Sequence, residues 1–113
     1  MTHLVLHVVV PIAVAAALYR PGWRSAALVM VATMIVDVDH LLADPIYDPA
    51  RCSIGFHPLH RGAAIAIYVL LFALPLVLRR RAGGRRDDVL RVAHLAGLGL
   101  LIHMALDALD CVV

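Results

Sequence analysis

The chain has 113 residues, enough for one domain, and 63% of them are hydrophobic, against roughly 45–50% in ordinary soluble domains. A soluble domain of this size cannot bury so much apolar surface, because its surface-to-volume ratio is too high. The net charge is only +2, and no aromatic residues are interleaved with the arginine runs at 79–86, so nucleic acid is not expected as a partner. Membrane lipid is the expected partner of the excess apolar surface.

Four apolar stretches follow one another along the chain, at Leu4–Tyr19, Ala26–Ala43, Ala63–Leu78 and Val89–Leu109. Each is close to the roughly 17–25 residues that cross a bilayer as a helix, and backbone groups in lipid must be satisfied within their own segment. The stretches predict an all-α protein, a four-transmembrane-helix bundle with helices at about 3–19, 25–44, 61–79 and 88–110. Residues 1–113 then form a single integral membrane domain.

The arginines predict the orientation of this bundle. Most of them lie in the first and third connections between the apolar stretches: Arg20, Arg24, Arg79, Arg80, Arg81, Arg85 and Arg86. The second connection carries only Arg51 and Arg61, and both chain ends lack arginine. Because arginine-rich loops stay in the cytoplasm, we expect a multi-pass protein of the bacterial inner membrane. Both termini and the 45–61 loop would lie on the non-cytoplasmic side.

Imidazoles and carboxylates gather at that outer side, and only one histidine, His94, is expected at the cytoplasmic interface instead. Three pairs share helix faces: His3/His7 and His103/Asp107 at i,i+4, and Asp37/His40 at i,i+3. Ionisable groups inside a membrane are expensive and normally pair, line a cavity or hold an ion. Any single one, such as His3, is equally explained by the headgroup boundary. The convergent set Asp37, His40, His103 and Asp107 predicts a divalent metal site, for zinc or alternatively manganese or iron.

The two cysteines fit the same topology. Cys52 lies in the outer loop, and Cys111 follows the fourth apolar stretch, so both face the oxidising side of the membrane. A disulfide would tie the loop to the fourth helix and stabilise the fold by roughly 4 kcal/mol on the chain-entropy model. Two buried thiols or two added metal ligands are the alternatives.

Three motifs carry a resemblance to known proteins. They are D-x-D-H at 37–40, C-S-I-G-F-H-P-L-H at 52–60 and H-x-x-x-D-x-x-D-C at 103–111. On these residues the chain resembles a family of small uncharacterised bacterial membrane proteins over nearly its whole length. It is more distantly similar to membrane-bound metal-dependent hydrolases, which include LexA-regulated proteins of the inner membrane.

The resemblance implies metal-ligand roles for one set of residues: His7, Asp37, His40, His60, His103 and Asp107. The hydrolases carry a further histidine where this chain has Ile65, and His57 is the nearest substitute. In a hydrolase, Asp39 or Asp110 would accept the proton of the attacking water or orient a histidine. Arg61 would receive an anionic head group. A lipid or phosphoester is the expected substrate, because the site lies at headgroup depth.

Two other functions remain open from the sequence. The metal could be structural, clamping thin helices that have little hydrophobic drive to associate in lipid, in an assembly or stress-response component. The protein could also be a small transporter subunit, although the inner half of the bundle lacks the ionisable residues of a continuous relay. Gly97 and Gly99 permit close helix packing, either within one chain or in a homo-oligomer.

Overall fold

The computed structural model describes residues 2–19, 22–42, 54, 58–78 and 85–112, and the side chains of these residues apart from those of 2–4, 38–42, 85–87, 110 and 112. In this part of the chain every regular element is a helix. They follow in the order α1 (Thr2–Leu18), α2 (Trp23–Ala32), η1 (Thr33–Leu42), η2 (Pro58–His60), α3 (Gly62–Leu78) and α4 (Arg85–Val112), where η marks a 3₁₀ helix. The prediction of an all-helical fold with four long helical segments is confirmed.

The second of these segments changes its helix type halfway. α2 ends at Ala32 and η1 begins at Thr33, and each contains 10 residues. At the junction the hydroxyl of Thr33 donates a hydrogen bond to the carbonyl of Met30, a local bond that competes with the regular α-helical ladder. Because a 3₁₀ helix rises by ~2.0 Å per residue and an α-helix by ~1.5 Å, α2 and η1 together extend over roughly 35 Å.

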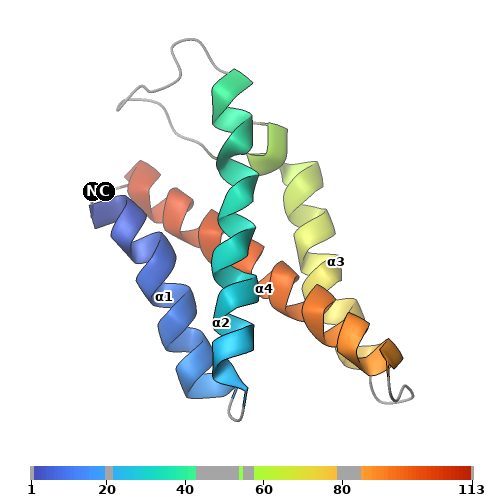
Figure 1. Ribbon diagram of the computed structural model, residues 1–113. Helices are drawn as coiled ribbons and strands as arrows, with labels where there is room; N and C mark the ends of the chain where they lie inside the picture. Colours follow the sequence, from blue (N-terminus) through green and yellow to red (C-terminus); the bar gives the residue numbers. More distant parts are fainter. Residues whose placement is uncertain (1, 20–21, 43–53, 55–57, 79–84, 113) are drawn as a thin grey trace.

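Helix α4 lies diagonally across the other helices and is the element that they all contact (Figure 1). Two glycines make the crossings close. A Cβ atom on Gly97 would lie 2.5 Å from the backbone nitrogen of Phe72 in α3, and one on Gly99 would lie 2.9 Å from the Cα of Met30 in α2. No real side chain tolerates such distances, so α4 approaches both helices at positions that have no side chain.

Two apolar clusters fill the interior. One joins α1, α2 and α4 and is built on Ala15, Ala26, Ala27, Met30 and Leu95. The other joins η1, α3 and α4 through Val36, Tyr68 and Met104. The small residues of the first cluster keep α1 and α2 close to α4, whereas the larger side chains of the second hold η1 and α3 beside the other half of α4.

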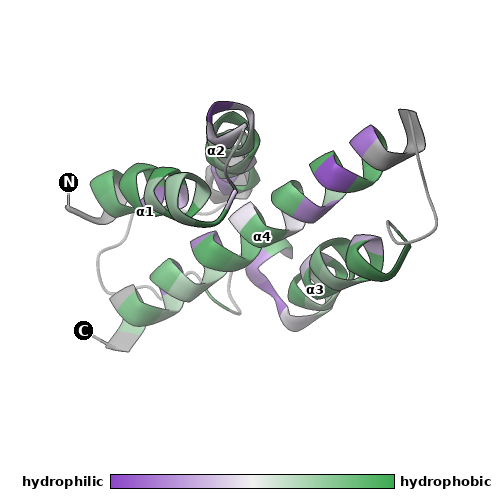
Figure 2. Ribbon diagram, turned by 90° about the horizontal axis from the view of Figure 1, so that it is seen from below, coloured by the Kyte–Doolittle hydropathy of each residue, from purple (hydrophilic) through white to green (hydrophobic). Residues whose placement is uncertain are grey.

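The outward faces of the helices are also apolar (Figure 2). Leu18, Leu28 and Ile35 are each more than 70% exposed, at 72%, 71% and 77%. Among the described residues, one segment is long and apolar enough to cross a membrane by length and composition, Asp88–Leu109 of α4. Val5–Leu18 and Gly62–Leu78 are apolar but shorter. The structure therefore contains the four predicted helical segments. That the chain crosses a membrane four times stays a prediction.

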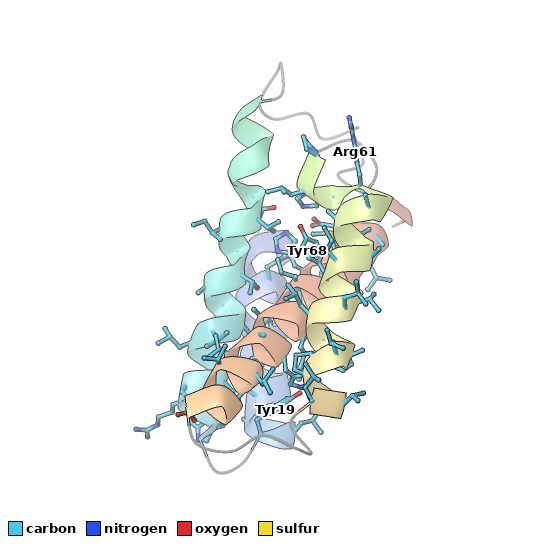
Figure 3. All side chains as sticks on the ribbon, turned by 90° about the vertical axis from the view of Figure 1, so that its right-hand side faces the viewer. Tyr19, Arg61 and Tyr68 are labelled. Carbon is cyan, nitrogen blue, oxygen red and sulfur yellow. The ribbon has the colours of Figure 1, made fainter. Side chains whose placement is uncertain are left out.

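His94 is buried in the bundle and differs from its expected place at the interface. Its Nδ1–H donates to the carbonyl of Phe72 at 2.8 Å, and its Nε2 accepts from the hydroxyl of Tyr19 at 2.7 Å. Its ring also stacks on Phe72, with 4.7 Å between the centroids. Both ring nitrogens are satisfied, one by Tyr19 directly after α1 and the other by α3, which removes the need for water. His94 thus ties three helices at the end that holds Tyr19, opposite the end at which Arg61 stands (Figure 3).

Candidate metal centre

Three histidine and two aspartate side chains from four helical elements meet at one end of the bundle. His7 comes from α1, Asp37 from η1, His60 from η2, and His103 and Asp107 from α4. His103 and Asp107 are four residues apart and so lie on the same face of α4. The start of α1, the end of α4 and η2 all lie at this end (Figure 1). The expected gathering of imidazoles and carboxylates at one end is therefore present.

Four of these residues, Asp37, His60, His103 and Asp107, form a compact set that we call the His/Asp quartet. One ligand atom from each lies within 4.8 Å of the others. The Nε2 of His60 lies 3.0 Å from Asp107 Oδ2 and 3.4 Å from Asp37 Oδ1. The Nε2 of His103 lies 2.9 Å from Asp37 Oδ1 and 3.3 Å from Asp107 Oδ2. Each imidazole nitrogen thus faces an oxygen of both aspartates.

The spacing and chemistry of the quartet fit a divalent cation. Ligand bonds of about 2.0–2.1 Å place neighbouring donor atoms roughly 3–4 Å apart. The four N···O distances run from 2.9 to 3.4 Å, and all four donor atoms lie within 4.8 Å of one another. Hydrogen bonding alone suits this pattern less well, because a single Nε2–H that is shared between two oxygens is not well aligned with either. Two carboxylates this close also repel each other unless a positive charge lies between them.

His7 lies beside the quartet and contacts the other oxygen of Asp107. Its Nε2 is 3.0 Å from Asp107 Oδ1, and its ring meets that of His103 edge to face, with 4.3 Å between the centroids. Asp107 Oδ2 is then left to face the two quartet histidines. This arrangement is typical of a residue that orients a metal-binding carboxylate from outside the ligand shell.

The quartet is buried on three sides and accessible on one. The side chains of His60, His103 and Asp107 are 0%, 3% and 3% exposed, whereas that of Asp37 is 39% exposed. Asp37 marks the side from which water or a substrate can reach the quartet.

Tyr68 holds His60 in place, and the sequence patterns did not single it out. Its hydroxyl donates to the carbonyl of Leu59 at 2.8 Å, so α3 fixes the short helix η2 on which His60 lies. The available signal was the single tyrosine of an otherwise apolar helix, about two turns after His60. Tyrosine buried in such surroundings normally needs a partner for its hydroxyl.

The other residues expected at the site are less completely described. The backbones of Asp39 and His40 lie in η1 and that of Asp110 in α4, but their side chains are not among those described. His57 and Cys52 lie outside the described residues. The disulfide from Cys52 to Cys111 therefore stays a prediction, with Cys111 placed in the last turn of α4. Arg61 is exposed next to η2 and extends beyond the end of the bundle (Figure 3).

Comparison with known proteins identifies a family whose function is unknown. The chain belongs to a family of unknown function, DUF6122, whose model matches residues 1–81. The match includes α1 to α3 with His7, Asp37 and His60, whereas His103 and Asp107 lie beyond it. No curated protein and no solved structure matches the chain significantly. The family agrees with the expected resemblance to uncharacterised proteins, and the resemblance to hydrolases is not shown.

Proposed function

We propose that this protein is a membrane-embedded, metal-dependent hydrolase that acts on a lipid or phosphoester at the non-cytoplasmic face of a bacterial inner membrane. The observation that carries the proposal is the His/Asp quartet, in which ligand atoms from η1, η2 and α4 converge within 4.8 Å. The partial exposure of the Asp37 side chain supports a site that water and a reactant can reach.

Asp37, His60, His103 and Asp107 would hold the ion, with His40 or His57 as a further ligand from the neighbouring segments. Mixed imidazole and carboxylate donors favour zinc, with manganese or iron as the alternatives. A bound divalent ion would supply hydroxide near neutral pH by lowering the pKa of its water to about 7.

The chain's own groups would perform the remaining steps. His7 keeps Asp107 oriented through its hydrogen bond to Oδ1. Asp39 or Asp110 would accept the proton of the attacking water, because both are carboxylates on elements that carry quartet residues. Arg61, exposed one residue after His60, would bind a phosphate or another anionic head group.

Several features support the membrane setting of this chemistry. The roughly 35 Å length of α2 and η1 exceeds the ~30 Å hydrocarbon layer, and Asp88–Leu109 of α4 is a candidate span in its own right. The quartet lies toward one end of both segments, at the depth where a lipid head group would meet it. Multi-pass insertion with both termini outside follows from the arginine distribution.

The test of metal binding is elemental analysis of the purified protein beside two variants. The double variant Asp37→Ala/His103→Ala removes one carboxylate and one imidazole of the quartet and should lose nearly all bound metal. Asp88→Ala changes an exposed aspartate at the opposite end of α4 and should keep the wild-type metal content. Near-zero metal in all three proteins would contradict the proposal.

The test of catalysis is turnover of phospholipid vesicles and phosphoesters by the metal-loaded protein. We expect Asp39→Asn or Asp110→Asn to abolish hydrolysis while metal content and folding are retained. The alternative of a structural metal clamp is favoured by the number of elements that the site joins, since α1, η1, η2 and α4 all contribute. In that case quartet variants would lose metal and folding together, and no lipid class would be turned over.

A further inference from the structure

We propose that an apolar groove beside the quartet holds one acyl chain of the molecule whose head group lies at the metal centre. The groove has a volume of about 570 Å³ and opens on the side of the bundle between α2–η1 and α4. A volume of this size is typical of sites for small organic molecules. The inference rests on the proposed function, because it names the substrate class of the same site as a lipid with a hydrocarbon chain.

The lining of the groove is almost entirely hydrocarbon. Ala32 and Val36 line it from α2 and η1, Leu59 from η2, and Ala96 and Leu100 from α4. Of these elements, η1, η2 and α4 also carry Asp37, His60 and His103. The groove is therefore built from the same parts of the chain as the quartet.

The two hydroxyl groups in the lining are already used within the protein. Thr33 donates to the carbonyl of Met30, and Tyr68 donates to that of Leu59. A polar ligand would leave its own hydrogen-bonding groups unmatched in such a groove, which is costly. An alkyl chain needs no polar partner and is the ligand that this surface suits.

The groove lies beside the quartet, whose residues follow three of its lining residues in the chain without lining the groove themselves. Val36 precedes Asp37, Leu59 precedes His60, and Leu100 lies one helical turn before His103. A ligand that fills both places must be apolar along its length and polar at one end. One acyl chain of a phospholipid, together with its ester and head group, has this form. Its ester would lie at the quartet and its phosphate toward Arg61.

An apolar helix of a second copy is the competing occupant of the groove. It would place hydrocarbon against Asp37, which is 39% exposed, and would remove water from a carboxylate without replacing its hydration. An amphiphile avoids this cost, because its polar end meets Asp37. Because of this difference in the desolvation of Asp37, we expect a lipid chain in the groove and not a helix of a second copy.

The experiment uses the full chain in phosphatidylglycerol vesicles that contain a probe lipid with a diazirine in one acyl chain. After illumination, mass spectrometry locates and counts the cross-linked residues. Ala32→Phe fills the groove from α2, and Ala96→Leu fills it from α4. Ala13→Phe is the matched control, since Ala13 is exposed on α1 as Ala32 is on α2, but lies outside the groove.

We expect wild-type cross-links to concentrate at 32–36 and 96–100. Both groove variants should reduce them by roughly tenfold, the factor expected when about two methylene groups lose their buried contacts, and Ala13→Phe should not. Metal content is measured on the same samples and should stay at the wild-type level.

Labelling spread evenly over the lipid-facing helices, or groove labelling unchanged in both variants, would overturn the inference. A dimer whose interface protects 32–36 from the probe would also overturn it, in favour of a second copy. Failure of the proposed function looks different: the groove is still labelled selectively, but the protein contains no metal or hydrolyses no lipid.

Discussion

The two oxygens of Asp107 face different histidines, and this division separates the role of His7 from that of His60 and His103. His7 contacts Oδ1 at 3.0 Å, while Oδ2 faces His60 at 3.0 Å and His103 at 3.3 Å. The sequence resemblance implies that His7 is a ligand like the others. The geometry supports the role of a donor that orients the carboxylate, because His7 approaches the oxygen turned away from the quartet histidines.

Substitutions of His7 can separate these two roles. We expect His7→Ala to raise the dissociation constant of the metal by roughly 10–100-fold, as the loss of an orienting partner does. His7→Gln should restore most of the affinity, since its amide can still donate to Asp107 Oδ1. His103→Gln should lose the metal, because an amide is a poor substitute for a ligating imidazole. The measurement is metal titration by calorimetry, and equal losses in His7→Gln and His103→Gln would make His7 a ligand.

At the scale of the elements, the position of α4 determines whether the site forms. It supplies His103 and Asp107 and crosses both α2 and α3 through positions without side chains. His94 adds a second link near its start through the hydroxyl of Tyr19 and the carbonyl of Phe72. The length of α4 from His94 to His103 is about 13 Å at ~1.5 Å per residue. A small tilt at the Gly97 crossing would therefore move the ligands at the other end.

Gly97 in α4 and Gly62 in α3 offer a matched test of this crossing. A Cβ at Gly97 meets the backbone of α3 at 2.5 Å, whereas one at Gly62, the first residue of α3, meets nothing within 4 Å. We expect Gly97→Ala to destabilise the protein by about 1–3 kcal/mol through overpacking and to weaken metal binding. Gly62→Ala should change neither. Thermal unfolding in detergent and metal content measure both effects, and wild-type behaviour of Gly97→Ala would show that the helices do not cross so closely.

At the scale of the whole molecule, polar groups gather at the two ends of an apolar bundle. The quartet lies at one end. At the other, Arg91 donates to the hydroxyl of Ser25 at 3.2 Å and to the carbonyl of Gly22 at 3.3 Å. Figure 2 shows apolar residues along the helices between the ends. A bilayer around the middle of the bundle would leave both polar ends in the headgroup regions.

Reporter fusions test the orientation of this arrangement. We expect an alkaline phosphatase, active only outside the cytoplasm, to be active when fused after residue 113. It should be inactive when fused after Leu78, because the arginine-rich connection that follows is expected to stay inside. The reverse pattern would place the quartet at the cytoplasmic face, and activity at both junctions would contradict a multi-pass topology.

Composition and local spacing determined the number of helices, their approximate bounds and the collection of histidines and aspartates at one end. These features follow from short-range physics: apolar run length sets a helix, and i,i+4 spacing puts His103 and Asp107 on one face. The sequence also predicted that Asp37 joins this pair. Only the tertiary structure decided that the Nε2 of His60 faces both aspartates, that His7 takes the outer oxygen of Asp107, and that His94 is buried. It also decided the change to a 3₁₀ helix at Thr33 and the groove beside the quartet. Those outcomes depend on how closely helices far apart in the chain approach one another, which is set at crossings such as Gly97 and Gly99 and not by any single segment.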